Sequence, residues 1–152
     1  MAIPREVMTR PNPVPATPDA IVSGMRHFAD HCAVCHANNG SGDTEMGRGL
    51  YPRVPDMRAE PTQALTDGEL FHIIENGVRL TGMPAWGTGS AESEHASWKL
   101  VNFIRHLPTV TQKELTEMEH LNPKGPEEQM DPEEFLKGKD APAPAKPEHK
   151  HF

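Results

Sequence analysis

Two cysteines three positions apart, with a histidine directly after the second, constrain this chain of 152 residues more than any other feature. They lie in the stretch Cys32-Ala33-Val34-Cys35-His36. Two thiols at this spacing reach both vinyl groups of one haem from a single helical turn, and the adjacent imidazole then lies below the iron. The stretch therefore predicts one covalently attached haem c, with His36 as an axial iron ligand.

Three other kinds of site use the same cysteine spacing. A redox dithiol of the thioredoxin type occurs in a βαβ context, and the surrounding sequence shows no such pattern. A structural zinc site takes four Cys or His ligands, whereas the chain has only these two cysteines. A plain structural disulfide stays open on this stretch alone.

Composition divides the chain into three parts. Only 36% of the residues are hydrophobic, and the 16 prolines crowd toward the two ends. So thin an apolar content predicts a small core, which a large apolar cofactor would complete. We expect a Pro-rich N-terminal linker over residues 1–16, a compact domain over 17–107, and an acidic, Pro-rich C-terminal extension with short helices over 108–152.

Charge and hydropathy limit the partners. The net charge is −7 and no basic patch stands out, which argues against nucleic acid. An acidic surface suits a basic redox partner, although ordinary solvation explains it as well. No window is long enough to cross a bilayer, and no signal peptide is present. Because haem c is normally attached outside the bacterial cytoplasm, we expect a periplasmic or extracytoplasmic protein. Either the chain is a mature or trimmed form, in which the linker would follow a removed signal or a membrane anchor, or Met1 marks an engineered start.

Helix signals follow one another along the chain, and no strand pattern interrupts them. They combine N-capping residues with apolar residues on one helical face. The predicted helices span about 18–32, 67–76, 93–106 and 112–121, with one more short helix starting near Asp131. Residues 37–61 lack periodicity and predict a long loop wrapped around the cofactor. The fold class expected is all-α.

The stretch Gly82-Met83-Pro84 provides a second site residue. It has no helical period, and its flanking residues make a stiff loop on which a thioether can ligate iron. The competing methionines are Met25, Met46 and Met57. Met83 is preferred because only it has this context and lies far enough downstream for the chain to fold over the haem.

In their order along the chain, these features resemble class I cytochromes c. The resemblance covers Thr17–Leu107 and is to small mono-haem bacterial members, including the haem c domains of respiratory oxidases and dehydrogenases. The residues that carry it are Gly24, Phe28, Cys32, Cys35, His36, the run 67–77, Gly82-Met83-Pro84-Ala85-Trp86, Trp98 and Phe103.

The resemblance implies a cytochrome c fold, with three to four core helices around one haem and the first and last of them crossing near Gly24 and Trp98. It implies His36 as the proximal and Met83 as the distal iron ligand. It also implies a single-electron carrier of a respiratory chain that passes electrons between redox proteins and is not an enzyme.

Further residues are candidates for secondary roles. The haem propionates need donors, which Arg48, Tyr51, Arg53, Arg79 and Trp86 could supply, although each arginine is as readily a surface residue. A backbone carbonyl in residues 49–55 is expected to accept from Nδ1 of His36. His27 and His31, at i and i+4, could bind a metal, but surface or packing roles are favoured. His149 and His151 are interpreted as part of an ordinary tail.

Two rival functions remain. An enzyme or ligand-binding haem protein needs an open iron position, which carbon monoxide would reveal in the reduced protein. Alternatively, the linker or the C-terminal extension docks the domain onto a larger membrane redox complex. The two short capped helices expected after Pro108 favour a partly ordered extension.

Overall fold

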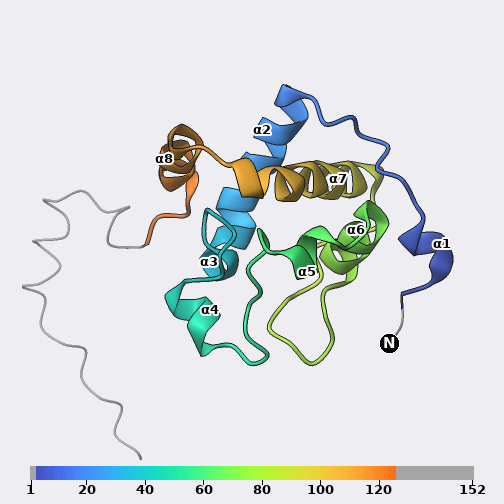
Figure 1. Ribbon diagram of the computed structural model, residues 1–152, viewed down its shortest axis with the longest axis horizontal. Helices are drawn as coiled ribbons and strands as arrows, with labels where there is room; N and C mark the ends of the chain where they lie inside the picture. The colour runs from blue at the N-terminus through green and yellow to red at the C-terminus, as the bar shows by residue number, and fades with distance from the viewer. Residues whose placement is uncertain (1–2, 126–152) are drawn as a thin grey trace, which may run out of the picture. The chain divides into compact units, whose positions relative to one another are not determined.

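The computed structural model describes residues 3–125, and every regular element within them is helical (Figure 1). This confirms the predicted all-α fold. In chain order the elements are α1 (Arg5–Met8), α2 (Pro18–His27), a π-helical turn (Phe28–Cys32), α3 (Ala33–His36), α4 (Glu45–Gly49), α5 (Glu60–Gln63), α6 (Asp67–Asn76), α7 (Ala91–His106), a 3-10 turn (Leu107–Thr109) and α8 (Gln112–Leu121).

Helices α2 and α7 cross at the centre of the fold (Figure 1). At the crossing Gly24 lies so close to α7 that a Cβ on it would come within 2.8 Å of the carbonyl carbon of Lys99. Just beyond it, the rings of Phe28 and Phe103 pack with centroids 5.1 Å apart, and both residues are buried. The glycine therefore permits a close helix contact, around which the apolar core forms.

Helix starts follow the capping signals of the sequence. Thr17 and Ser90 accept hydrogen bonds from the first turns of α2 and α7. Thr66 and Thr111 open α6 and α8 with full capping boxes, each completed by the glutamate at N3. The predicted starts near 18, 67 and 112 are confirmed, and α7 begins at Ala91, two residues before its expected start.

The periodicity of residues 18–32 predicts one regular helix, and the structure differs from this prediction. Helix α2 ends at His27, and a π-helical turn carries the chain from Phe28 to Cys32. The expected long loop also contains the one-turn helices α4 and α5. Apolar periodicity indicates which face of a helix is buried. It does not reveal a π turn, in which one extra residue is inserted into the helix.

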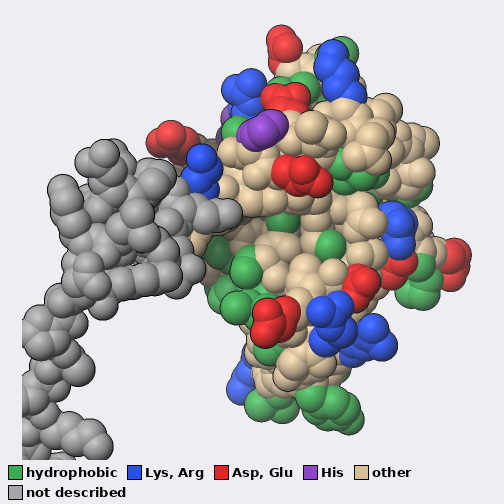
Figure 2. Space-filling model, turned by 90° about the vertical axis from the view of Figure 1, so that its left-hand side faces the viewer, with side chains coloured by type: hydrophobic (Ala, Val, Ile, Leu, Met, Phe, Trp, Pro, Cys, Tyr) green, Lys and Arg blue, Asp and Glu red, His purple; other side chains and the backbone are tan. Residues whose placement is uncertain are grey.

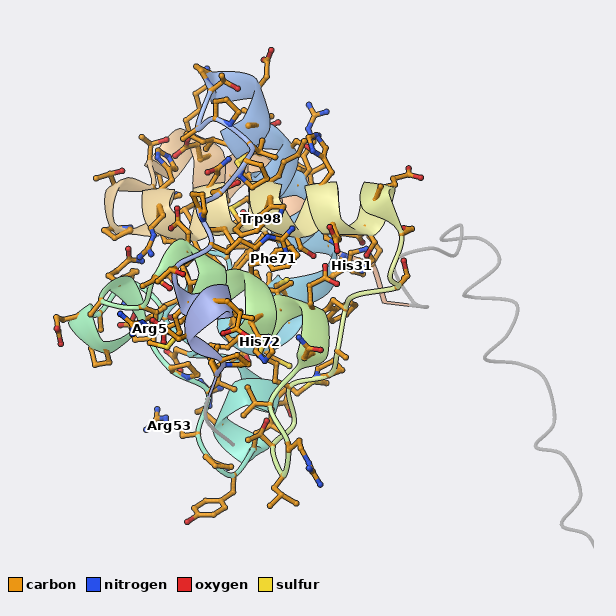
Figure 3. All side chains as sticks on the ribbon, turned by 90° about the vertical axis from the view of Figure 1, so that its right-hand side faces the viewer. Arg5, His31, Arg53, Phe71, His72 and Trp98 are labelled. Atoms are coloured by element: carbon orange, nitrogen blue, oxygen red, sulfur yellow. The ribbon has the colours of Figure 1, made fainter. Side chains whose placement is uncertain are left out.

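The N-terminal segment packs on the core, which differs from the linker predicted over 1–16. The side chain of Asn12 donates to Trp98 O at 3.1 Å and to Asn102 Oδ1 at 2.9 Å. The guanidinium of Arg10 lies 5.0 Å from the centre of the Phe71 ring, which stacks on Trp98 with centroids 4.0 Å apart (Figure 3). These contacts explain how a proline-rich segment of low apolar content is held in place.

The compact unit that contains the core ends at Asn122, beyond the boundary predicted at 107/108. Helix α8 belongs to it because Met118 is fully buried in the core cluster. The further helix expected from Asp131 and the pair His149/His151 lie outside the described residues.

Surface properties add two observations. Acidic and basic side chains are interspersed over the face seen in Figure 2. Within residues 3–125, no helix is long and apolar enough to cross a membrane.

Candidate functional site

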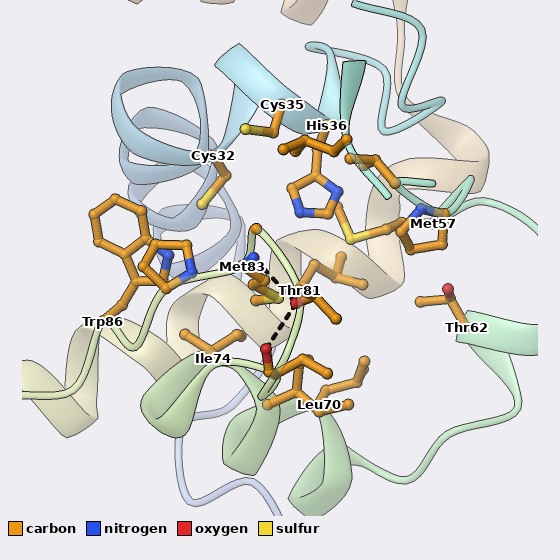
Figure 4. A pocket seen from close by; sticks show the side chains of 18 of the residues that line it. Cys32, Cys35, His36, Met57, Thr62, Leu70, Ile74, Thr81, Met83 and Trp86 are labelled. Atoms are coloured by element: carbon orange, nitrogen blue, oxygen red, sulfur yellow. Dashed lines mark hydrogen bonds between the residues drawn. The ribbon is translucent and has the colours of Figure 1, made fainter. Parts of the chain in front are cut away.

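A cavity of about 360 Å³ opens between α3, α6 and two irregular segments, residues 50–57 and 78–86 (Figure 4). Its size falls in the range of roughly 300–1,000 Å³ that is common for cofactor sites. The walls are mostly apolar, and the side chains that matter most for its chemistry are Cys32, Cys35, His36, Met57 and Met83. The structure therefore brings the predicted attachment residues and the predicted distal ligand to one cavity.

The wall of the cavity formed by residues 28–36, here called the attachment wall, carries both cysteines. Cys32 and Cys35 are free thiols on the cavity side of this wall (Figure 4). Burial raises the pKa of Cys32 to about 12, and the neighbouring Cys35 adds to the effect. A thiol held so firmly in its protonated form is a poor attacking thiolate, which disfavours the redox-dithiol interpretation.

His36 projects from the last residue of α3 into the cavity (Figure 4). Burial lowers its pKa, so the imidazole is neutral near pH 7, the form that ligates a metal. Its Nδ1 is buried without a hydrogen-bond partner, so the expected bond to a carbonyl in residues 49–55 is not formed. A neutral imidazole and two thiols that line the same cavity fit a covalently bound haem.

Met83 enters the cavity from the other side, on an irregular segment of residues 78–87 that we call the Met83 loop (Figure 4). Backbone bonds fasten this loop to the end of α6: Trp86 N–H donates to Ile74 O at 3.0 Å and Gly87 N–H to Glu75 O at 3.1 Å. The last carbonyls of a helix have no partner inside it, so the loop satisfies them and is held in return.

Two residues to which the sequence analysis gave no role at the site position Met83. The hydroxyl of Thr81 accepts from Met83 N–H at 3.2 Å and donates to Val78 O at 2.7 Å. Gly77 ends α6 with φ +66°, and a Cβ there would lie 2.6 Å from Met83 O. A glycine after a capped helix signals its end, but the sequence gives no sign that the Met83 loop returns to it.

The competing methionines occupy different environments. Met25 is buried in the core at 1% exposure and does not line the cavity. Met46 is half exposed, with its Sδ 3.4 Å from Cys35 Sγ. Met57 lines the same cavity as Met83 and is buried. The geometry thus leaves Met57 and Met83 as the methionines that border the space beside His36.

The predicted propionate donors are scattered. Trp86 lines the cavity, and Arg53 borders it with an exposed side chain that points outward (Figure 3). Arg48 pairs with Asp43 away from the cavity lining. Tyr51 is 93% exposed, and Arg79, also exposed, does not line the cavity. Of the five, only Trp86 has a side chain packed into the site.

The pair His27 and His31 forms an edge-to-face contact with ring centroids 4.9 Å apart. Burial, reinforced by the neighbouring His31, lowers the pKa of His27. His31 also packs 5.4 Å from the ring of Trp86 and lines the cavity. Within residues 3–125, no group of three or more His, Cys, Asp or Glu side chains is placed to hold a metal ion. The contacts seen for the pair are the ring contacts just described.

Comparison with protein families identifies the family of this chain. The family model described as Cytochrome C oxidase, cbb3-type, subunit III matches residues 19–104, more than half of the chain. The matched segment contains the attachment wall and the Met83 loop, and it ends before α8. Among curated proteins, the search finds no match.

Proposed function

The chain belongs to the cbb3-type cytochrome c oxidase subunit III family, and from this premise we propose that it carries single electrons through one haem c ligated by His36 and Met83. The family performs haem-based electron transfer and implies a covalently bound haem c. When bound, this group supplies an iron that cycles between the ferrous and ferric states. The observation that carries the proposal is one cavity in which two thiols, a neutral imidazole and a loop-held thioether converge.

The chain's own residues prepare the site for this role. Cys32 and Cys35 would attach the group to the attachment wall, and the neutral His36 would present a nitrogen ligand. Thr81 and the end of α6 hold the Met83 loop over the opposite side. With His36 and Met83 both holding the iron, no ligand position would remain for a substrate, which suits a carrier and argues against catalysis. The apolar walls exclude water and favour the less charged ferrous state.

Partners and location follow from the family and the attachment chemistry. We propose that electrons pass to and from redox proteins, with the chain serving as an electron-entry domain of a larger membrane oxidase complex. The name of the matching family supports this docking role. The periplasm or another extracytoplasmic compartment is the proposed location, because haem c attachment normally takes place there.

Spectroscopy of the haem-loaded full-length chain tests the proposal. A pyridine haemochrome assay should give one haem c per chain, and the ferric protein should show the methionine-to-iron band at the red end of the spectrum. Met83→Ala should abolish this band and let the reduced protein bind carbon monoxide. The matched variant Met57→Ala removes the other methionine of the cavity and should keep the band.

Two results would overturn the proposal. Loss of the band in Met57→Ala with its survival in Met83→Ala would assign the ligand to Met57. Rapid carbon monoxide binding by the unaltered reduced protein would show an open iron position, which favours a ligand-binding haem protein.

A further inference from the structure

The attachment wall contains a break in its helical hydrogen bonds. In an α-helix the N–H of Ala33 would donate to the carbonyl of Ala29, four residues earlier. In the π-helical turn it donates instead to Phe28 O. Ala29 is fully buried, so water cannot satisfy its carbonyl. Buried carbonyls are nearly always paired, and the Ala33 N–H that would pair this one in an α-helix is bonded to Phe28 O.

Asn122, the residue that caps the C-terminal end of α8, supplies a partner for this carbonyl. Its Nδ2 donates to Ala29 O at 2.7 Å across 93 positions of sequence. The same amide forms a reciprocal pair with Asn38: Asn122 Nδ2 donates to Asn38 Oδ1 at 2.9 Å, and Asn38 Nδ2 donates to Asn122 Oδ1 at 2.8 Å. One side chain thus bridges a residue three positions before Cys32 and a residue two positions after His36.

The backbone between those two contacts is strained. Ala37, directly after the proposed iron ligand His36, has φ +62° and ψ 156°. This region is almost confined to glycine, and another residue keeps it only where surrounding contacts hold it. The paired amides of Asn38 and Asn122 provide such contacts at the next residue, so they hold the turn that follows His36.

Helix α8 fixes the position of Asn122. The N–H of Asn122 donates to Met118 O at 2.9 Å, and Met118 is fully buried. Leu115 and Leu121 pack against the same core, and Glu114 bonds His106 at 2.9 Å at the other end of the helix. All of α8 lies beyond residues 19–104, so the family match does not account for it.

We propose that α8 is a clamp on the haem-attachment segment and that Asn122 is a positioning residue for His36. The proposal rests on the proposed function in one respect, namely that His36 ligates the iron. Asn122 closes the buried gap at Ala29 and holds the strained turn at Ala37, which fixes the imidazole and keeps water from its side of the cavity. Residues 112–122 of the predicted C-terminal extension therefore act on the redox centre through the attachment wall.

The test compares full-length, haem-loaded Asn122→Ala with the unaltered chain. Without the clamp, water reaches the attachment wall and stabilises the more highly charged ferric state. At a fixed potential we expect the oxidised-to-reduced ratio to rise about threefold, a fall in midpoint potential of roughly 30 mV at 59 mV per tenfold for one electron. The amides of residues 33–37 should exchange hydrogen about tenfold faster, and the His36 ring resonances should move.

Two matched variants complete the test. Asn38→Ala removes the amide pair and leaves the bond to Ala29, so it should shift the potential in the same direction by less. Glu117→Gln weakens a 3.9 Å ion pair between α8 and Arg26 on α2, and it should leave both readouts unchanged. If Asn122→Ala does not retain haem, Asn38→Ala decides alone.

Unchanged potential and unchanged amide exchange in the asparagine variants would overturn the clamp. Equal shifts in Glu117→Gln would do the same, because they would show that loosening α8 anywhere suffices. Absence of the methionine-to-iron band in the unaltered chain would count against the proposed function only. Amide exchange of residues 33–37 still reports the clamp in that case.

Discussion

The attachment wall and the Met83 loop face the same cavity but are held in different ways. The wall is helical, its Ala29 is fully buried, and α7 and α8 pack against it. The loop has no regular structure and depends on a few backbone bonds to α6 and on Thr81. The wall is thus stabilised mainly by apolar burial, with the Asn122 bonds at its edge, and the loop by a small set of hydrogen bonds, so damage to each should have a different signature.

The largest expected effect is on the wall. Gly24→Ala places a Cβ against the backbone of Lys99 at the crossing of α2 and α7, where neither helix can yield without shifting the core. Overpacking of this kind typically costs roughly 1–3 kcal/mol, and we expect the upper part of that range in guanidinium unfolding. The folded fraction should keep its methionine-to-iron band, because the Met83 loop is untouched.

Gly49→Ala is the matched control for this substitution. Gly49 is the last residue of α4, and nothing lies within 4 Å of a Cβ built there. Its free energy of unfolding should change by no more than about 0.5 kcal/mol. Equal losses in the two variants would show that the crossing is not the close contact described here.

The same contrast explains how far the sequence predicts this molecule. The haem motif, the Gly-Met-Pro stretch and the capping boxes are local patterns, and residues a few positions apart define them. They yielded the all-α fold, most helix starts, and the residues that meet in the cavity. The sequence also indicated a small core completed by a cofactor, in agreement with the cavity beside His36.

Contacts between distant residues were not predictable in this way. Asn12 bonds Asn102 across 90 positions, and Asn122 bonds Ala29 across 93. Asn12 lies in the segment interpreted as a linker, and Asn122 in the segment interpreted as an extension. Neither was expected to pack on the core, because asparagines among prolines form no periodic pattern that indicates burial. The π turn could not be predicted for the same reason. The side chain that bonds the buried carbonyl of Ala29 in this turn belongs to Asn122, which is remote in sequence.

The second prediction concerns the Met83 loop. Gly77→Ala combines an unfavourable backbone angle, φ +66°, with a Cβ placed 2.6 Å from Met83 O. We expect a stability loss of roughly 1–2 kcal/mol together with a weakened methionine-to-iron band and increased carbon monoxide binding. Gly24→Ala should give the opposite pattern, with a larger stability loss and an intact band.

Gly89→Ala separates the two causes within this prediction. Gly89 has φ +80°, but nothing lies within 4 Å of the position that its Cβ would take. The substitution should therefore destabilise through the backbone angle alone and leave the band unchanged. A weakened band in Gly89→Ala would mean that strain anywhere near the loop disturbs Met83, rather than the contact at Gly77.

The smallest expected effect lies in the first turn of α8, at the opposite end from Asn122. Burial alone would raise the pKa of Glu114, but hydrogen bonds from Thr111 N–H and from His106 outweigh it and hold that pKa below its usual value of 4.5. A carboxyl whose pKa is lower in the folded than in the unfolded state stabilises the fold fully at pH values above its unfolded pKa. This stabilisation is lost as pH falls through the folded pKa.

Glu114→Gln tests this support, because glutamine can still complete a capping box but carries no charge. Unfolding measured from pH 6 to pH 3 should show a shallower loss of stability in the variant, with a difference below about 1 kcal/mol because the pair is a quarter exposed. Glu117→Gln, on the same helix and more exposed, should follow the unaltered chain. Parallel curves for Glu114→Gln and the unaltered chain would show that the charge of Glu114 contributes nothing to holding α8, and that its remaining contacts with the core suffice.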